Sequence, residues 1–298
     1  MNGFLGEIGK KLAERWAALL ALPGLLFLAT AATADTLGWA HALDLARLRA
    51  RIELWAAEPV LRSVGGAALT VASVLAGSVA AGLVAAALGR LLSRLWNLPG
   101  RRPPASILAG ARRHRSRRAK SEADDPAATA RQVSAAIARA DRVSLVQAER
   151  PTWIGDRLHA CRVRVEASYG LDLDAAWPRL WLLLPDTART EILASREAYD
   201  ASARLMGWAL LYLLLTGWWW PAALIAAATG VTAWSKARAS AAGFTDLVES
   251  AVDLYGRELA ARLGHSVRDD GPLTVAEGEA ITTMTRKSRW DPHSPLAD

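Results

Sequence analysis

Two uncharged stretches placed back to back constrain this chain more than any other feature. Met206 to Pro221 holds no charged residue and ends in three tryptophans and a proline, and the uncharged segment Ala222 to Ser235 follows at once. Tryptophan is enriched at membrane–water interfaces, and proline suits the first position of a helix because no intrahelical partner is lost there. The pattern therefore predicts a membrane hairpin whose second helix begins at Pro221.

The return segment of this hairpin is short. Residues 221–235 would form roughly 22 Å of helix at ~1.5 Å per residue, whereas the hydrocarbon core is ~30 Å thick. Two interpretations stay open. Local thinning of the bilayer, with Lys236 and Arg238 reaching the headgroups, lets the segment cross; alternatively the hairpin is re-entrant. Both return the chain to the same side.

Two earlier segments, 16–34 and 64–89, are also uncharged and exceed the ~18 residues typical of a transmembrane helix. The first follows basic residues and ends in Ala32-Thr33-Ala34, so a cleaved signal peptide is its alternative; the long lead before it favours an uncleaved helix. The second carries small residues at a four-residue spacing, which favours close helix packing, although an alanine-rich helix also produces such a ladder by chance. The ladder is Ser73, Gly77, Ala81, Ala85 and Gly89.

The distribution of Lys and Arg predicts the orientation. The segment from Arg90 to Lys120 holds ten Lys or Arg residues, nine of them Arg, and no acid, whereas residues 35–63 are balanced in charge. Positive loops stay in the cytoplasm. We therefore expect a multi-pass protein of the cell membrane with four transmembrane helices and both termini in the cytoplasm. Within 35–63, an apolar face at helical spacing predicts an amphipathic helix on the outer leaflet; it comprises Leu45, Leu48, Ile52 and Trp55.

The basic segment next to the second apolar stretch favours contact with anionic lipid headgroups. Nucleic-acid binding is the competing interpretation, but no aromatic residue lies between Arg101 and Lys120 and no recognised binding motif is present, so no nucleic-acid partner is expected. The arginines expected to contact lipid are Arg112, Arg113, Arg115, Arg117 and Arg118.

The fold class expected from these patterns is all-α, with the membrane helices joined to a cytoplasmic helical module. Helices are predicted from Pro126 onwards, from near Asp156 to a cap at Gly170, and over 175–184, where Asp172 or Asp174 opens the helix. A fourth, capped by Asp186, runs into the hairpin, and the return helix extends to about residue 263. The predicted organisation is 1–15 cytoplasmic, 16–34 transmembrane, 35–63 extracytoplasmic, 64–89 transmembrane, 90–125 basic linker, 126–204 helical module, 205–235 transmembrane hairpin, 236–265 helical extension and 266–298 disordered tail.

Several motifs between residues 151 and 264 resemble a recurrent group of multi-pass helical membrane proteins from high-GC bacteria that has no established activity. The resemblance implies shared architecture and no functional residues. It rests on Pro151-Thr152 with Gly155-Asp156-Arg157, on Tyr169-Gly170-Leu171-Asp172, on Trp177-Pro178-Arg179-Leu180-Trp181, on Trp220-Pro221-Ala222 and on Val252-Asp253-Leu254-Tyr255-Gly256.

Motifs that would indicate catalysis are missing from the sequence. Phosphate-binding loops, zinc-protease motifs, nucleophile elbows and kinase signatures do not occur. The single cysteine, Cys161, excludes an intramolecular disulfide and is expected to be a small buried residue. No catalytic, cofactor-binding or metal-binding residue is predicted, no cofactor is expected, and the chain is not expected to be an enzyme.

One cluster in the helical module suggests recognition. Arg179 lies between Trp177 and Trp181 and close to two aspartates. These residues either engage a protein partner, or the arginine stacks on tryptophan and pairs with a local carboxylate to lock the turn. Three functions follow as hypotheses: a membrane scaffold or signalling protein that recruits a partner, a membrane-perturbing effector that oligomerises through its helices, or a component of a transporter or channel. Expected partners are membrane lipids, a cytoplasmic protein and, as an open alternative, a second copy of the chain.

Overall fold

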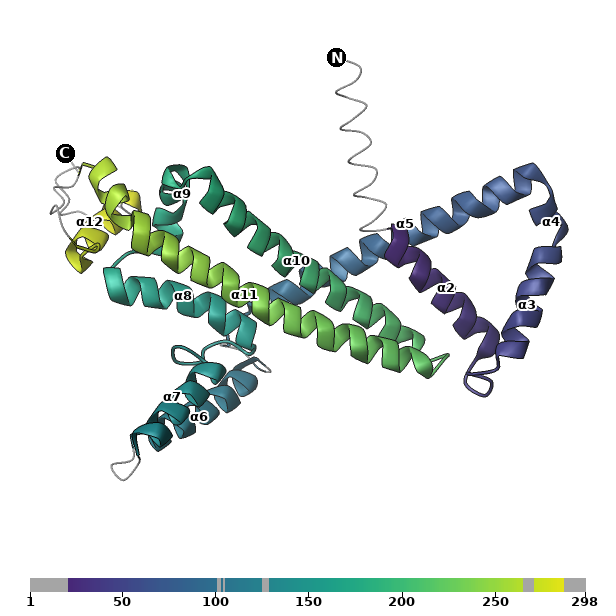
Figure 1. Ribbon diagram of the computed structural model, residues 1–298, viewed down its shortest axis with the longest axis horizontal. Helices are drawn as coiled ribbons and strands as arrows, with labels where there is room; N and C mark the ends of the chain where they lie inside the picture. Colours follow the sequence, from purple (N-terminus) through teal and green to yellow (C-terminus); the bar gives the residue numbers. More distant parts are fainter. Residues whose placement is uncertain (1–20, 101–102, 104, 125–128, 265–270, 287–298) are drawn as a thin grey trace, which may run out of the picture. The chain divides into compact units, whose positions relative to one another are not determined.

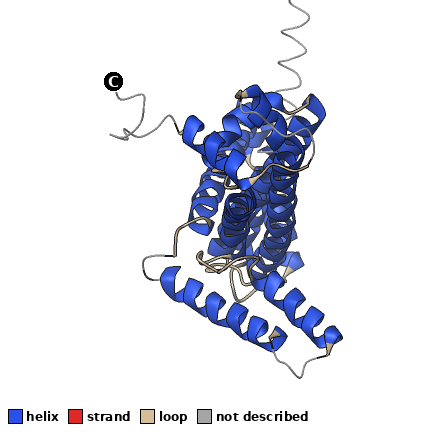
Figure 2. Ribbon diagram, turned by 90° about the vertical axis from the view of Figure 1, so that its left-hand side faces the viewer, coloured by secondary structure: helices blue, strands red, loops and turns tan. Residues whose placement is uncertain are grey.

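The computed structural model describes residues 21–100, 103, 105–124, 129–264 and 271–286. These residues form helices and connecting loops with no strand among them, so the prediction of an all-α fold is confirmed (Figures 1 and 2). The helices are α2 (Leu22–Leu37), α3 (Leu45–Ala57), α4 (Pro59–Arg62), α5 (Val64–Trp96), α6 (Ala105–Ala123), α7 (Ala130–Val143), α8 (Trp153–Tyr169), α9 (Leu173–Leu183), α10 (Asp186–Leu215), α11 (Pro221–Arg262) and α12 (Val275–Thr285).

The helices divide into two compact units. The first unit comprises the described residues up to 93 together with 200–235, and the second comprises 94–199 together with the described residues from 236 onwards. Helices α10 and α11 are unbroken and contribute residues to both units. For the first two thirds of α10 this continuity follows from the sequence, because no proline or glycine occurs in residues 187–206 and either residue would weaken a helix interior. Helix α11 is unbroken although it contains Gly230, Gly243 and Gly256.

The first unit is held together by small residues where its helices meet. A Cβ atom added to Gly24 of α2 would lie 2.1 Å from the Ser78 carbonyl oxygen of α5, and one added to Gly207 of α10 would lie 2.1 Å from the Ala85 oxygen. The Ser78 hydroxyl also donates to the Ala21 carbonyl at 2.7 Å. Side chains larger than hydrogen would therefore push these helices apart, as expected where packing relies on close approach.

The predicted small-residue ladder of α5 is divided between different surroundings. Ala85 is fully buried in a cluster with Trp208, and Ala81 packs on the same cluster. A Cβ added to Gly77 would lie 3.3 Å from the Leu28 methyl of α2. Ser73, at the other end, is exposed. The ladder from Gly77 to Ala85 therefore packs against helices of the same chain, whereas Ser73 is exposed among the described residues.

Two tryptophans link the loop after α2 to the turn between α10 and α11. The Trp39 indole donates to the Gly217 carbonyl at 3.0 Å, and the Trp219 indole donates to the Ala42 carbonyl at 2.9 Å. Helix α11 begins at Pro221, as the sequence predicts. The two reciprocal bonds hold these loops together within the first unit.

The predicted amphipathic helix is present as α3, which Asp44 caps by accepting a hydrogen bond from the Arg47 amide. None of its residues is buried. The apolar side chains Leu45, Ile52 and Trp55 are all exposed. Helix α3 therefore leaves most of its apolar face exposed in the part of the chain that the structure describes, whereas Leu48 is half-buried.

The core of the second unit gathers side chains from α8, α9, α11 and α12. Its fully buried members include Leu171, Leu180, Leu259 and Ile281. A neighbouring cluster unites Leu184 at the end of α9 with residues of α10 and α11. Helices far apart in the sequence thus share one apolar core.

Helix boundaries in the second unit agree with the sequence in part. Helix α8 ends at Gly170, as predicted, with φ of +61°, a conformation that glycine adopts at little cost. Asp172 rather than Asp174 caps α9. Helix α8 starts a full turn before Asp156, because Thr152 provides the N-cap by accepting from the Gly155 amide.

Two predicted segments differ from the structure. Helix α12 lies within 266–298, the segment predicted to be disordered, because a Thr274–Glu277 capping box starts a helix that buries Ile281. The basic linker 90–125 is largely helical, with α5 continuing to Trp96 and α6 beginning at Ala105. The helix predicted from Pro126 is described from Thr129, the N-cap of α7, and residues 125–128 lie outside the described ranges.

Among the described residues, α5 is the one helix that is both long and apolar enough to cross a membrane, while α2 is apolar but shorter. Residues 16–20 of the first predicted span, and the predicted segment 1–15, lie outside the described ranges. The expectation of four membrane-spanning helices is therefore not confirmed.

Candidate functional site

The carboxyl end of α5 contacts the segment that precedes and starts α8. Helix ends leave carbonyl oxygens without intrahelical partners. Here the Thr152 hydroxyl donates to the Trp96 carbonyl at 2.8 Å, and the Arg150 guanidinium donates to the Asn97 carbonyl at 2.6 Å. A Cβ added to Gly155 would lie 2.2 Å from the Trp96 oxygen. The motif from Pro151 to Gly155 is therefore a docking surface for the end of α5.

Asp156, the next residue, is the most heavily bonded carboxylate of this site. Its Oδ1 accepts from the amides of Glu149 at 3.0 Å and Arg150 at 2.7 Å. Its Oδ2 accepts from Arg112, from Nε at 3.0 Å and Nη2 at 2.6 Å. Arg112 Nη2 also donates to the Val143 carbonyl at 2.7 Å. With only 2% of the Asp156 side chain exposed, this buried pair crosslinks α6, the end of α7 and α8.

This geometry corrects one predicted lipid contact. Arg112 was expected at the membrane surface, but its guanidinium faces the buried Asp156 carboxylate and its side chain is only 17% exposed. A buried carboxylate requires such a partner, because an uncompensated charge in a low-dielectric interior is costly. Arg115, Arg117 and Arg118 are exposed and Arg113 is half-buried, so the basic surface of α6 excludes Arg112.

The tryptophan cluster of α9 lies at the edge of the core. The rings of Trp177 and Trp181 have centroids 5.9 Å apart and are half-buried against Leu184 and its neighbours. Arg179 donates from Nη1 to the Ala175 carbonyl, one turn back, at 2.7 Å. The arginine therefore donates to the backbone of its own helix. Each tryptophan packs partly against the core and is partly exposed to solvent.

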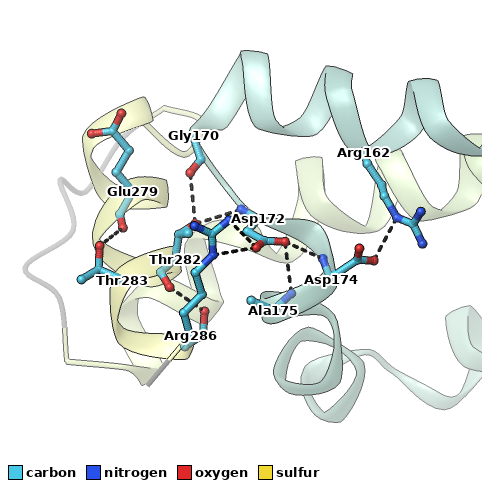
Figure 3. Close-up of polar contacts among 10 residues, drawn as sticks. Arg162, Gly170, Asp172, Asp174, Ala175, Glu279, Thr282, Thr283 and Arg286 are labelled. Carbon is cyan, nitrogen blue, oxygen red and sulfur yellow. Dashed lines mark hydrogen bonds and ion pairs between the residues drawn. The ribbon is translucent and has the colours of Figure 1, made fainter. Parts of the chain in front are cut away.

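The two aspartates near this cluster have other partners (Figure 3). Arg162 of α8 donates to Asp174 at 2.9 Å. Asp172 accepts from Arg286 at 2.8 Å and from the amides of Asp174 and Ala175. The expectation that Arg179 pairs with a local carboxylate is therefore wrong.

Asp172 belongs to a polar corner that receives α12 (Figure 3). The Thr282 hydroxyl donates to the Gly170 carbonyl at 3.1 Å and accepts from the Asp172 amide at 2.8 Å. Burial opposes ionisation of Asp172, but the Arg286 guanidinium and the two amides outweigh it and hold the pKa of this carboxyl below its usual range. Beside the corner lies an open polar depression of about 430 Å³.

Polar pairs also join α8 to α11. Arg157 pairs with Asp246, Arg164 with Glu249 at 3.2 Å, and the Tyr169 hydroxyl donates to Asp253 at 2.7 Å. The hydrogen bond to Asp253, followed by burial, raises the pKa of Tyr169 to about 12.

Cys161 lies in the interior of the same interface. It is buried, as the sequence predicts, and burial followed by the negative charge of Glu249 raises the pKa of its thiol to about 12. Because the thiolate is the reactive form, this cysteine is inert near neutral pH. Burial also raises the pKa of Glu249 against the opposing influence of Arg164 and Arg157.

Across the ranges that the structure describes, no three histidine, cysteine or acidic side chains converge in a way that could hold a metal ion. No protein-family model, curated protein or solved structure matches this chain. The resemblance noted from the sequence therefore stays a prediction. The structure does show what its motifs do physically, since Asp156, Gly170 and Asp172 cap, dock or crosslink helices.

Proposed function

We propose that this chain is a multi-pass membrane protein with both termini in the cytoplasm, and that its second unit is a helical scaffold that recruits a protein partner. Membrane insertion concerns the first unit, and recruitment of a partner concerns the second.

The observation that carries the proposal is the way residue sizes are distributed in the first unit. Glycine, alanine and serine lie where its helices meet, as at Gly24 and Ala85. Large aliphatic side chains point outwards, among them Leu69 at 71%, Leu214 at 66% and Val231 at 71% exposure. Exposed apolar surface of this kind is unfavourable in water, whereas lipid tails cover it without cost.

The indole bonds of the first unit support the proposed topology. Trp39 and Trp219 hold the loop after α2 beside the turn that follows α10. The charge distribution predicts that residues 35–63 lie outside, and a hairpin that crosses from the cytoplasm has its turn on the same outer side, where tryptophan belongs at the headgroup level. Lys236 follows within α11, and the basic surface of α6 follows α5. Loop pairing thus supports a common side for the two segments, and the charge distribution favours the outer side for both.

Reporter fusions test the membrane part of the proposal. We expect fusions at position 120, within 236–243 and at the C-terminus to report the cytoplasm, and a fusion near Leu48 to report the outside. A fusion near Leu48 with cytoplasmic activity contradicts the topology. Recovery of the unfused chain in the soluble fraction contradicts membrane insertion altogether.

The recruiting surface is assigned to the tryptophan cluster of α9. Trp177 and Trp181 are half-buried, Leu182 beside them is 74% exposed, and aromatic and arginine side chains are frequent anchors of interfaces. Arg179 is half-exposed and donates one hydrogen bond to its own helix, so its guanidinium retains other donors.

Crosslinking in native membranes, followed by identification of what co-purifies, tests recruitment. We expect a specific protein to be captured by the wild-type chain and lost with Arg179→Ala. Arg162→Ala is the matched control, because Arg162 is an exposed arginine on a neighbouring helix whose partner is an exposed aspartate. Equal capture by both variants contradicts the assignment of the surface. Capture of nothing by the wild-type chain contradicts recruitment.

A further inference from the structure

The solvent-exposed face of α6 carries both apolar and basic side chains. Ile107 is 68% and Leu108 54% exposed, although both are large aliphatic residues. Leu108 and Arg115 are seven residues apart, and Ile107 and Arg118 are eleven apart, so at 3.6 residues per turn they share one side of the helix. Ala109 and Ser116, on the other side, are buried. The beginning of this face is apolar and its end is cationic.

The positive charge of this face is not neutralised within the described residues. Arg115, Arg117 and Arg118 are exposed, and no described carboxylate lies within ion-pair distance of them. The nearest acid in sequence, Glu122, pairs with Arg139 of α7 at 3.1 Å. Residues 105–120 contain no acid. An anionic partner would therefore meet unopposed cationic side chains.

We propose that this face of α6, formed by Ile107, Leu108, Arg115 and Arg118 and flanked by the exposed Arg117, binds the anionic phospholipid surface of the membrane that holds the first unit. This rests on the proposed membrane location. Exposed aliphatic residues enter the acyl boundary while neighbouring arginines bind phosphate groups, which is how interfacial helices bind. Only eight residues separate Trp96, the last residue of α5, from Ala105, a reach of at most ~30 Å.

Nucleic acid fits the same face less well. A nucleic-acid backbone would neutralise the arginines but leave Ile107 and Leu108 in water, and α6 offers no aromatic side chain on which bases could stack. Arg112 is not part of the lipid-binding face, because its guanidinium pairs with Asp156.

The test uses the full chain in nanodiscs. Ala111 is exposed on α6, and Ala111→Cys accepts a thiol-reactive fluorophore selectively because the native Cys161 is buried. Quenching by nitroxide-labelled lipid is then compared between discs of phosphatidylcholine alone and discs that also contain phosphatidylglycerol. We expect stronger quenching in the anionic discs and a decrease as salt screens the charges.

Removing charges from α6 tests whether lipid binding depends on the arginines of this helix or only on the total positive charge of the chain. Arg115→Gln, Arg117→Gln and Arg118→Gln combined should lower the docking equilibrium in anionic discs on the order of a hundredfold, from about a fivefold contribution per basic residue. A control variant loses the same number of charges from exposed arginines on other helices, namely Arg131, Arg162 and Arg262.

Each result of this experiment has a defined meaning. Equal quenching in both kinds of disc, or equal loss with the α6 variant and the control, overturns the proposal. If added duplex DNA or RNA changes the fluorescence of the α6 label while lipid composition does not change its quenching, nucleic acid is the partner and the lipid proposal is overturned. Ile107→Ser with Leu108→Ser, which keeps every charge, should weaken quenching as well. Failure of these tests leaves the chain in the membrane fraction, whereas failure of the proposed location removes it from that fraction.

Discussion

Replacing Asp156 by asparagine isolates the charge of the buried crosslink, because the amide keeps the volume of the carboxylate. An asparagine oxygen still accepts from the Glu149 and Arg150 amides, but its NH2 group faces the Arg112 guanidinium, also a donor. Arg112 is then left with an uncompensated charge at a site where its side chain is 17% exposed. Breaking one partner of a buried pair costs ~3–5 kcal/mol, and we expect Asp156→Asn to destabilise the second unit by about that amount.

Asp174→Asn is the matched control. The Arg162–Asp174 pair has a comparable Nε–O distance, 2.9 Å, but its side chains are 52% and 68% exposed, and exposed pairs contribute only ~0–1 kcal/mol. Thermal unfolding of the full chain in detergent, followed by tryptophan fluorescence, should show a drop of roughly 6–20 °C for Asp156→Asn and under about 4 °C for the control. Equal shifts in the two variants would refute the reasoning.

A double substitution checks the cause of that loss. Arg112→Met combined with Asp156→Leu removes both charges and replaces them with apolar side chains. Because two desolvated charges gain little over well-packed apolar groups, the double variant should be more stable than Asp156→Asn alone. If the double variant is less stable than Asp156→Asn, the stability of this site comes mainly from the hydrogen bonds with the backbone of Val143, Glu149 and Arg150. The uncompensated charge of Arg112 would then not be the main cause of the loss.

Three further outcomes are expected. Gly207→Leu should separate α5 from α10, because its Cβ would lie 2.1 Å from a carbonyl oxygen, whereas Gly65→Ala, with open space around it, should be tolerated; crosslinking between cysteines placed on α5 and α10 measures the difference. Trp177→Ala should destabilise the second unit by about 2–3 kcal/mol, below the ~3–5 of a fully buried aromatic, and Arg179→Ala by about 1 kcal/mol for one lost hydrogen bond, as measured by denaturant unfolding. The pKa of Asp172 is lowered in the fold, so its contribution to holding α12 is present above the unfolded pKa and lost as pH falls through the folded one. Protection of α12 amides against hydrogen exchange, corrected for the intrinsic pH dependence of exchange, should therefore fall with acid, and Asp172→Asn should lower this protection at neutral pH and reduce its further loss in acid.

Local structure in this chain follows from local sequence. Pro221 starts α11 because its fixed φ and missing N–H suit a first helical turn. Gly170 ends α8 because a positive φ is inexpensive without a Cβ atom. Helix α10 runs from Asp186 to Leu215, and no proline or glycine occurs in its first two thirds, residues 187–206. Each of these depends on neighbours within a few residues, so a single sequence suffices to predict it.

The partners of charged side chains depended on the tertiary structure. Arg112 looked like one of several equivalent arginines, and Asp156 like the start of a helix, since nothing local indicates that residues 44 apart meet. Helix α12 was concealed for the same reason: its segment is polar in composition, and its stability comes from burying Ile281 against helices far away in the chain. Long-range pairing depends on which faces the packed helices bring together, and that is decided by the whole core at once.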